Sequence, residues 1–170
     1  MDKQTPSVKP IAYNYGLYLA LINIAVLLII YAANIDKNWG LSIVSIILTI
    51  TVFVLGIKTY KSSNDNKLTI GQAIKVGLAI AVIGGILTAL YSYFHYEYIY
   101  PEFIELQKET AYSQMLEKSP DLTDEQIEKA MGISNIFMNS TFFSLSAILG
   151  SLIFGLITSL ILGLIMKKED

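Results

Sequence analysis

Four long runs without a charged residue constrain the fold of this chain more than any other feature. Each run is long enough for a helix that crosses a hydrocarbon layer, which takes about 20 apolar residues. Four runs of this length in one short chain exclude a soluble fold. The runs are Ile11–Ile35, Asn38–Ile57, Val76–Phe94 and Gly132–Met166.

The composition further narrows the classes of protein to which this chain can belong. Only 15% of the 170 residues are charged and 54% are hydrophobic, whereas ordinary soluble domains carry about 25% charged residues. The net charge of -2 lacks the basic excess of a nucleic-acid-binding protein. The chain has no cysteine, which excludes thiol catalysis, disulfides and Cys-ligated metal sites.

We predict an all-α integral membrane protein that forms a single membrane domain over residues 1–170. In lipid only helices and closed barrels satisfy every backbone group, and four segments are too few for a barrel. The first run exceeds the apolar stretch of about 7–15 residues in a cleavable signal peptide, so we expect it to be retained. The four expected transmembrane helices are Tyr13–Ala33, Trp39–Ile57, Ala73–Phe94 and Phe142–Met166.

The lysines predict the orientation of these spans. Eight of the twelve lie in the N-terminal segment, the loop between the second and third spans, and the C-terminal tail. Because cytoplasmic segments carry the excess of Lys and Arg, we expect both termini and that loop in the cytoplasm. Ten of the fourteen acidic residues fall on the other side, although acidic residues contribute little to the rule.

The acidic loop between the third and fourth spans, about residues 97–135, is predicted to be helical and to lie outside the membrane. Pro101 suits the first turn of a helix over Glu102–Glu117. Thr123 and Gln126 have the spacing of a capping box, which predicts the start of a second helix. The loop has too few apolar residues for a core of its own, so we expect these helices to rest on the membrane surface or to extend the spans.

Few side chains suggest chemistry. The apolar centre of each span lacks ionisable residues, which weighs against a pump or a proton-coupled carrier but leaves a passive pore open. His95, the single histidine, lacks the His-Glu-x-x-His pattern of a zinc site, and we interpret it as an interfacial side chain among tyrosines. Glu102, Glu105 and Glu109 share a helix face; they could hold Ca²⁺, but a solvated face is the simpler interpretation. We therefore expect no catalytic residue, no cofactor and no metal site, and we predict that the protein is not an enzyme.

Small residues at strict four-residue spacing form the most informative pattern. Lipid gives helices no hydrophobic reason to associate, so close approach across small residues must supply the contact. Two such stripes predict an intimate crossing of the third and fourth spans, or a face left for a second copy of the protein. A shorter stripe in the first span contains Ala12, Gly16 and Ala20. The two stripes are Ala73, Gly77, Ala81, Gly85 and Ala89 in the third span, and Ala147, Ser151, Gly155, Ser159 and Gly163 in the fourth.

Two motifs and a tyrosine-rich segment resemble a known family. The motifs are GIKTYK, Gly56–Lys61, and LTIGQAIKVG, Leu68–Gly77, and the tyrosines precede Pro101. They are similar to the domain-of-unknown-function 4199 family of short, four-span bacterial proteins. The resemblance covers nearly the whole chain. It includes the length of the chain, the spacing of the spans and the acidic outer loop. It implies an inner-membrane location and supplies no activity.

The sequence predicts a small multi-pass membrane protein whose leading function is non-enzymatic, as a structural, assembly or interaction subunit that self-associates in the lipid bilayer. The alternative is an oligomeric transporter or channel for a small neutral or hydrophobic solute. Polar side chains lining a water-filled cavity would favour the transporter, and a sealed bundle with only lipid-facing grooves would favour the subunit. We expect no nucleic-acid partner, and the sequence does not identify a small-molecule ligand.

Overall fold

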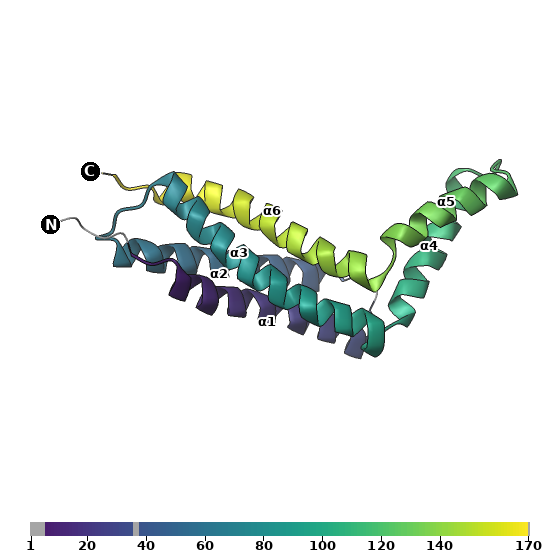
Figure 1. The fold of residues 1–170 in the computed structure, drawn as a ribbon, viewed down its shortest axis with the longest axis horizontal. Helices are drawn as coiled ribbons and strands as arrows, with labels where there is room; N and C mark the ends of the chain where they lie inside the picture. The colour runs from purple at the N-terminus through teal and green to yellow at the C-terminus, as the bar shows by residue number, and fades with distance from the viewer. Residues whose placement is uncertain (1–5, 36–37, 170) are drawn as a thin grey trace. The chain divides into compact units, whose positions relative to one another are not determined.

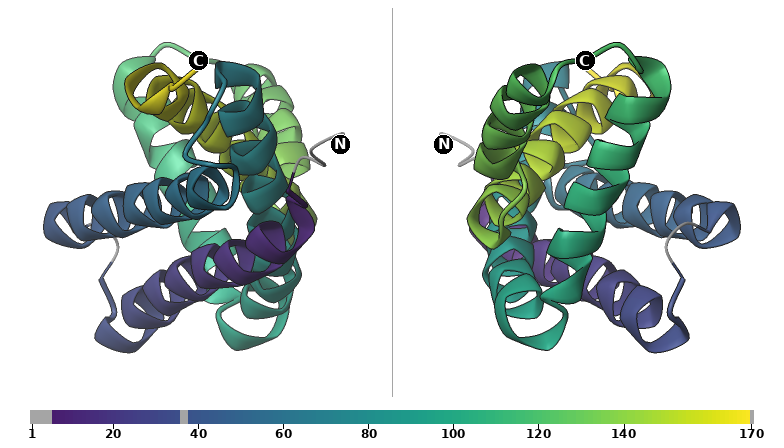
Figure 2. Two further views of the ribbon diagram at one scale, coloured as in Figure 1. Left: turned by 90° about the vertical axis from the view of Figure 1, so that its left-hand side faces the viewer. Right: turned by 90° about the vertical axis from the view of Figure 1, so that its right-hand side faces the viewer.

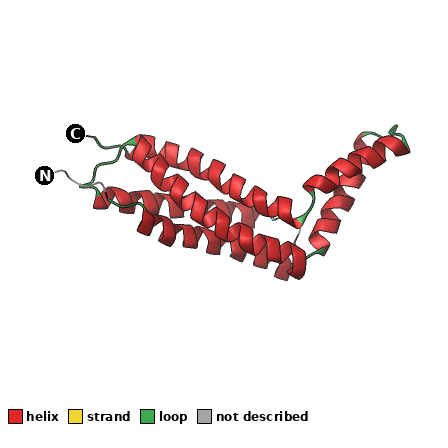
Figure 3. Cartoon of the chain, in the orientation of Figure 1, coloured by secondary structure: helices red, strands yellow, loops and turns green. Residues whose placement is uncertain are grey.

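A computed structural model describes residues 6–35 and 38–169. The described residues are helical apart from turns, loops and one isolated backbone bridge, which confirms the predicted all-α fold (Figure 3). The helices are α1 Lys9–Ala33, α2 Trp39–Ser63, α3 Ile70–Phe94, the π-helix η1 His95–Ile99, α4 Glu102–Lys118, α5 Asp124–Phe137 and α6 Ser140–Met166 (Figure 1).

Four of these helical stretches are long and apolar enough to cross a membrane, as predicted: α1, α2, α3 with η1, and α6. They extend a few residues beyond the expected spans. α1 begins at Lys9 with Pro10 in its first turn, where a missing N–H costs no helical hydrogen bond. α2 continues to Ser63.

Two capping boxes explain where α3 and α5 begin. At the start of α3, the Gln72 N–H donates to Thr69 Oγ1 at 3.2 Å, and the Thr69 N–H donates to Gln72 Oε1 at 2.9 Å. The same reciprocal arrangement joins Thr123 and Gln126 at the start of α5, as the sequence predicted. Each box satisfies two backbone groups that the helix itself leaves without a partner.

The chain divides into two compact units, which we describe separately. The first comprises Met1–Thr88 and Ala147–Asp170 and contains α1, α2, most of α3 and most of α6. Its helices alternate in direction, so the start of α1, the end of α2, the start of α3 and the end of α6 lie at one end (Figure 1).

Polar contacts tie the chain together at this end of the first unit. The Lys61 ammonium on α2 donates a hydrogen bond of 2.7 Å to the carbonyl oxygen of Met166, in the last turn of α6. Leu68, before α3, and Lys168, after α6, exchange two backbone hydrogen bonds of 2.9 and 3.0 Å. The tail after α6 is therefore hydrogen-bonded to the loop between α2 and α3.

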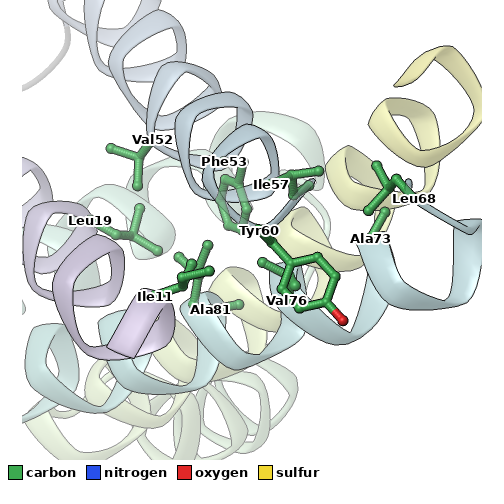
Figure 4. Close-up of a cluster of buried hydrophobic side chains, with 11 residues drawn as sticks. Ile11, Leu19, Val52, Phe53, Ile57, Tyr60, Leu68, Ala73, Val76 and Ala81 are labelled. Carbon is green, nitrogen blue, oxygen red and sulfur yellow. The ribbon is translucent and has the colours of Figure 1, made fainter. Parts of the chain in front are cut away.

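The hydrophobic core of the first unit gathers around α3. Half of the most apolar window of α3 is buried, against 17–22% in the other three spans. Tyr60 and Phe53 of α2 pack into this core beside residues of α1 and α3 (Figure 4). The end views show α1 and α2 running at an angle to α3 and α6 (Figure 2). The buried cluster is Ile11, Leu19, Val52, Phe53, Ile57, Tyr60, Leu68, Ala73, Val76, Ile80 and Ala81.

The small residues of α3 and α6 face each other in antiparallel register. Each step of four residues forward along α3 is matched by four residues back along α6, over about three helical turns. A Cβ atom added at Gly155 would lie 2.6 Å from Ala81 Cβ, and one added at Gly77 would overlap Ser159. The facing pairs are Ala73 with Gly163, Gly77 with Ser159, Ala81 with Gly155 and Gly85 with Ser151.

α3 meets α1 on a different face, where Gly16 of the short first-span stripe lies against Gly84, which the sequence analysis did not single out. A Cβ atom added at Gly84 would lie 2.7 Å from Leu19 Cδ2 and 3.0 Å from the Gly16 carbonyl oxygen. Ala12 and Ala20, the neighbours of Gly16 in the short first-span stripe, are also buried. α3 is thus closely packed on two faces, which accounts for its deep burial.

The second unit, Ala89–Ser146, contains η1, α4 and α5 with the adjoining ends of α3 and α6. α4 matches the predicted helix to within one residue, and α5 continues to Phe137. Asn139 Oδ1 then accepts a hydrogen bond of 2.9 Å from the Phe142 N–H, at the start of α6. The acidic loop is therefore helical, as predicted.

Candidate functional site

Residues of the four helices of the first unit line an open hollow of about 330 Å³, which we call the central cavity. Its volume lies at the lower end of the range of small-molecule sites, about 300–1,000 Å³. All four helices contribute to the lining, so a bound molecule would contact each of them. The lining residues are Leu19, Asn23, Ser45, Ile46, Thr49, Phe53, Thr88, Ala147, Gly150, Ser151 and Phe154.

Two hydrogen bonds fix polar side chains in the wall of the central cavity. The Asn23 Nδ2 amide on α1 donates to Thr88 Oγ1 on α3 at 3.4 Å. The Ser151 hydroxyl on α6 donates to the carbonyl oxygen of Ala81 on α3 at 2.9 Å. Both bonds join different helices, a common use of polar residues within apolar bundles.

α2 contributes two hydroxyl groups to the cavity wall, and these differ from the polar groups above in their hydrogen bonding. Ser45 and Thr49 lie one helical turn apart and both line the central cavity. Within residues 6–35 and 38–169, neither hydroxyl makes a hydrogen bond, whereas the nearby Thr51 donates to the Ile47 carbonyl oxygen at 2.8 Å. A hydroxyl is one donor and two acceptors, so these two groups can bind a polar atom inside the cavity.

Four of the five polar residues of the central cavity lie deep within their helices, and the fifth, Ser45, lies nearer to the start of α2. Asn23, Thr49, Thr88 and Ser151 are each about ten residues or more, or about 15 Å at 1.5 Å per residue, from either end of their candidate spans. Every lining residue is uncharged. The cavity can therefore recognise a hydroxyl, carbonyl or amide group, but its lining holds no counter-charge for an ion.

A second hollow, which we call the lateral groove, lies between α1 and α2 and has a volume of about 280 Å³. It is apolar except for Ser45, which also lines the central cavity. The two hollows are therefore adjacent. The groove is lined by Leu21, Ile22, Ala25, Val26, Ile29, Leu41, Val44, Ser45 and Leu48.

Two of the predicted stripe residues, Ala147 and Ser151, line the central cavity. Ala89 is buried in the second unit. The remaining seven pack α3 against α6 and lie outside the cavity lining. Sequence analysis did not single out the other polar lining residues. Asn23, an amide in the middle of an apolar run, was the one available signal, since polar residues at that depth are often functional.

His95 belongs to the second unit and is only 1% exposed. Its Nδ1 lies 3.4 Å from the Tyr91 hydroxyl, and the rings of Tyr96 and Tyr100 pack at centroid distances of 5.3 and 6.3 Å. The sequence suggested an interfacial side chain among tyrosines. The tyrosines are its neighbours, but the wide turn of η1 places the imidazole inside their cluster.

Glu102, Glu105 and Glu109 of α4 lie on an exposed face. Glu105 Oε1 is paired with Lys108 Nζ at 3.0 Å, and Glu102 and Glu109 flank this pair along the helix. In the part of the chain that the structure describes, no three His, Cys, Asp or Glu side chains are grouped to hold a metal ion.

A family model described as "Protein of unknown function (DUF4199)" matches residues 14–168, nearly the whole chain. The chain belongs to the DUF4199 family. The resemblance expected from the GIKTYK and LTIGQAIKVG motifs is thus confirmed. In this DUF4199 protein the matched region includes the whole lining of the central cavity and both small-residue stripes. No curated protein and no solved structure matches the chain.

Proposed function

We propose that this DUF4199 protein binds a small uncharged or hydrophobic solute within its four spans, in the inner membrane of a bacterium. The lysine distribution supports an orientation with both termini in the cytoplasm. In that orientation, the fastened end of the first unit, with Lys61 and Lys168, faces the cytoplasm. The acidic helices α4 and α5 then lie on the outer side.

The central cavity is the observation that carries this proposal. A bundle that serves only as a scaffold needs no hollow, because each unfilled space forfeits packing contacts. Here four helices line an open hollow of about 330 Å³, and α2 contributes two hydroxyl groups without a hydrogen-bond partner in the described structure. Polar groups at that depth in a bilayer are costly and are usually kept for a function.

Cysteine reactivity tests whether the cavity admits a small uncharged molecule. The chain has no cysteine of its own, so Thr49→Cys creates a single thiol in the cavity wall. We expect iodoacetamide, a small uncharged reagent, to alkylate this thiol in intact membranes. Alkylation requires the thiolate, which forms in a polar, hydrated site and not in hydrocarbon.

Leu149→Cys is the matched control, because Leu149 is an exposed apolar residue of α6 outside the cavity lining. Its thiol should face lipid and react far more slowly. The proposal would be overturned if the thiols at positions 49 and 149 reacted equally slowly in membranes while both reacted fully after denaturation.

A structural or assembly subunit is the second candidate function. The first half of α2 exposes large apolar side chains along its length, among them Trp39, Ile43 and Ile47 at 72, 55 and 57% exposure. A neighbouring protein or a second copy could cover this surface, as could lipid. Native mass spectrometry in detergent tests this role, because an assembly subunit should retain a partner or a defined oligomeric state.

A further inference from the structure

The lateral groove shows how a molecule could reach the central cavity. Ser45 lines both hollows, so the groove between α1 and α2 leads toward the polar side chains. Apart from Ser45 its lining is wholly apolar, with Ala25 of α1 and Val44 of α2 among the exposed residues. An apolar passage of this kind suits a molecule that is dissolved in lipid.

We infer that the solute is a neutral, lipid-soluble molecule that carries a hydroxyl or carbonyl group on an apolar chain, and that it enters from the bilayer through the lateral groove. The inference rests on the proposed function and specifies its ligand. The polar group would bind to Asn23, Ser45 or Thr49 in the central cavity, and the apolar chain would occupy the groove.

The absence of charge in both linings separates this ligand from a phospholipid. All lining residues of the two hollows are uncharged, and desolvating a charged headgroup without a partner is costly. Asn23 and Thr49 also lie about 15 Å or more along their helices from the span ends, close to the middle of a hydrocarbon layer about 30 Å thick. A hydroxyl or carbonyl group can reach that depth at a far lower cost than a phosphate.

Photolabelling with a diazirine-bearing 1-decanol tests the inference on the full chain in phosphatidylcholine nanodiscs. After irradiation, mass spectrometry should find adducts on the α1 and α2 peptides that contain Ala25 and Val44. Ala25→Phe places a ring in the groove and should abolish these adducts. Ala25 is exposed, so this variant should keep the melting temperature of the wild type.

Ala32→Phe is the matched control, because it makes the same substitution on α1 at an exposed residue outside the groove lining. It should retain the adducts. A diazirine-bearing phosphatidylcholine should not label the groove selectively. The inference is wrong if this phospholipid gives the same adducts, or if Ala25→Phe leaves the decanol adducts unchanged.

The cysteine test keeps the two proposals distinguishable. If the Thr49→Cys thiol reacts with iodoacetamide but decanol adducts are absent from the groove, the cavity admits small uncharged molecules by another route and only the inference fails. If the thiol is inert in membranes, the proposed function fails, and the inference fails with it.

Discussion

The Ser151 hydroxyl bonds to the Ala81 carbonyl oxygen at 2.9 Å and also lines the central cavity. One side chain thus belongs both to the crossing of α3 with α6 and to the candidate binding site. Gly85 faces the same serine, since a Cβ atom added there would lie 3.1 Å from Ser151 Cβ. A change in the crossing should therefore reach the cavity wall.

Replacing Gly155 or Gly85 with Leu should destabilise the first unit. At Gly155 the added carbons would meet Ala81 and the ring of Phe53, and at Gly85 they would meet Ser151. We expect each variant to lose about 1–3 kcal/mol of stability, the usual cost of overpacking a tight interface. The loss should appear as a lower melting temperature in detergent.

Gly150→Leu is the internal control for these variants. Gly150 also belongs to α6, but a Cβ atom added there meets nothing within 4 Å. The Gly150→Leu variant should therefore have a melting temperature close to that of the wild type. If Gly85→Leu and Gly155→Leu also melt like the wild type and keep its oligomeric state, the small residues do not hold α3 and α6 together.

The hydrogen bond between Asn23 and Thr88 should contribute a small coupling energy to the packing of α1 against α3. A double-mutant cycle with Asn23→Leu and Thr88→Val measures it. Interhelical polar pairs in membranes average about 0.6 kcal/mol, and the 3.4 Å separation favours a value no larger than this. Thr51→Val provides the comparison, since the Thr51 hydroxyl bonds within its own helix. Additive effects of Asn23→Leu and Thr88→Val would contradict the coupling.

Lys61→Met should weaken the attachment of the C-terminal end of α6 to α2. The ammonium group bonds to the Met166 carbonyl oxygen, where the partial negative charge of a helix C-terminus favours a cation. We expect a loss of about 0.3–1 kcal/mol, which shrinks as salt concentration rises. Lys58→Met removes the same charge from an exposed position on α2 and should have less effect. An equal loss in both variants would mean that charge, and not this contact, stabilises the helix end.

The proposed orientation predicts opposite labelling of two cysteine variants. Ser63→Cys lies at the end of α2 and Ser113→Cys lies on α4, both at exposed positions. A membrane-impermeant thiol reagent added to intact cells should label position 113 from the periplasm, and position 63 only after the cells are opened. Labelling of both positions in intact cells would require a different topology.

The four spans could be predicted because each is a local property of the sequence. A charge-free run of this length has few alternatives in any fold, and the capping box of Thr123 and Gln126 is likewise contained within four residues. The contact between Gly77 and Ser159 corresponds to one of the two predicted partners of the stripes, which were the other span and a second copy of the protein. The choice stayed open because a small-residue stripe shows that another backbone approaches closely but does not show which one.

The cavity and the second glycine contact depend on which helix faces are brought together. Asn23 and Thr88 are 65 positions apart, and no local pattern pairs them. Gly84 precedes the predicted Gly85 directly but points to α1 and not to α6, since adjacent residues on a helix lie about 100° apart. The burial of His95 was also missed, because it depends on the single wide turn of η1.

The antiparallel register of α3 and α6 makes each facing pair share a fixed volume. At the pair formed by Gly77 and Ser159, a larger residue on one helix leaves room only for a smaller one on the other. Gly77→Ser alone should therefore be harmful, yet combined with Ser159→Gly it should recover most of the lost stability. Relatives of this chain that carry a bulkier residue on one side of a pair should carry the compensating glycine on the other, so the two helices evolve as one.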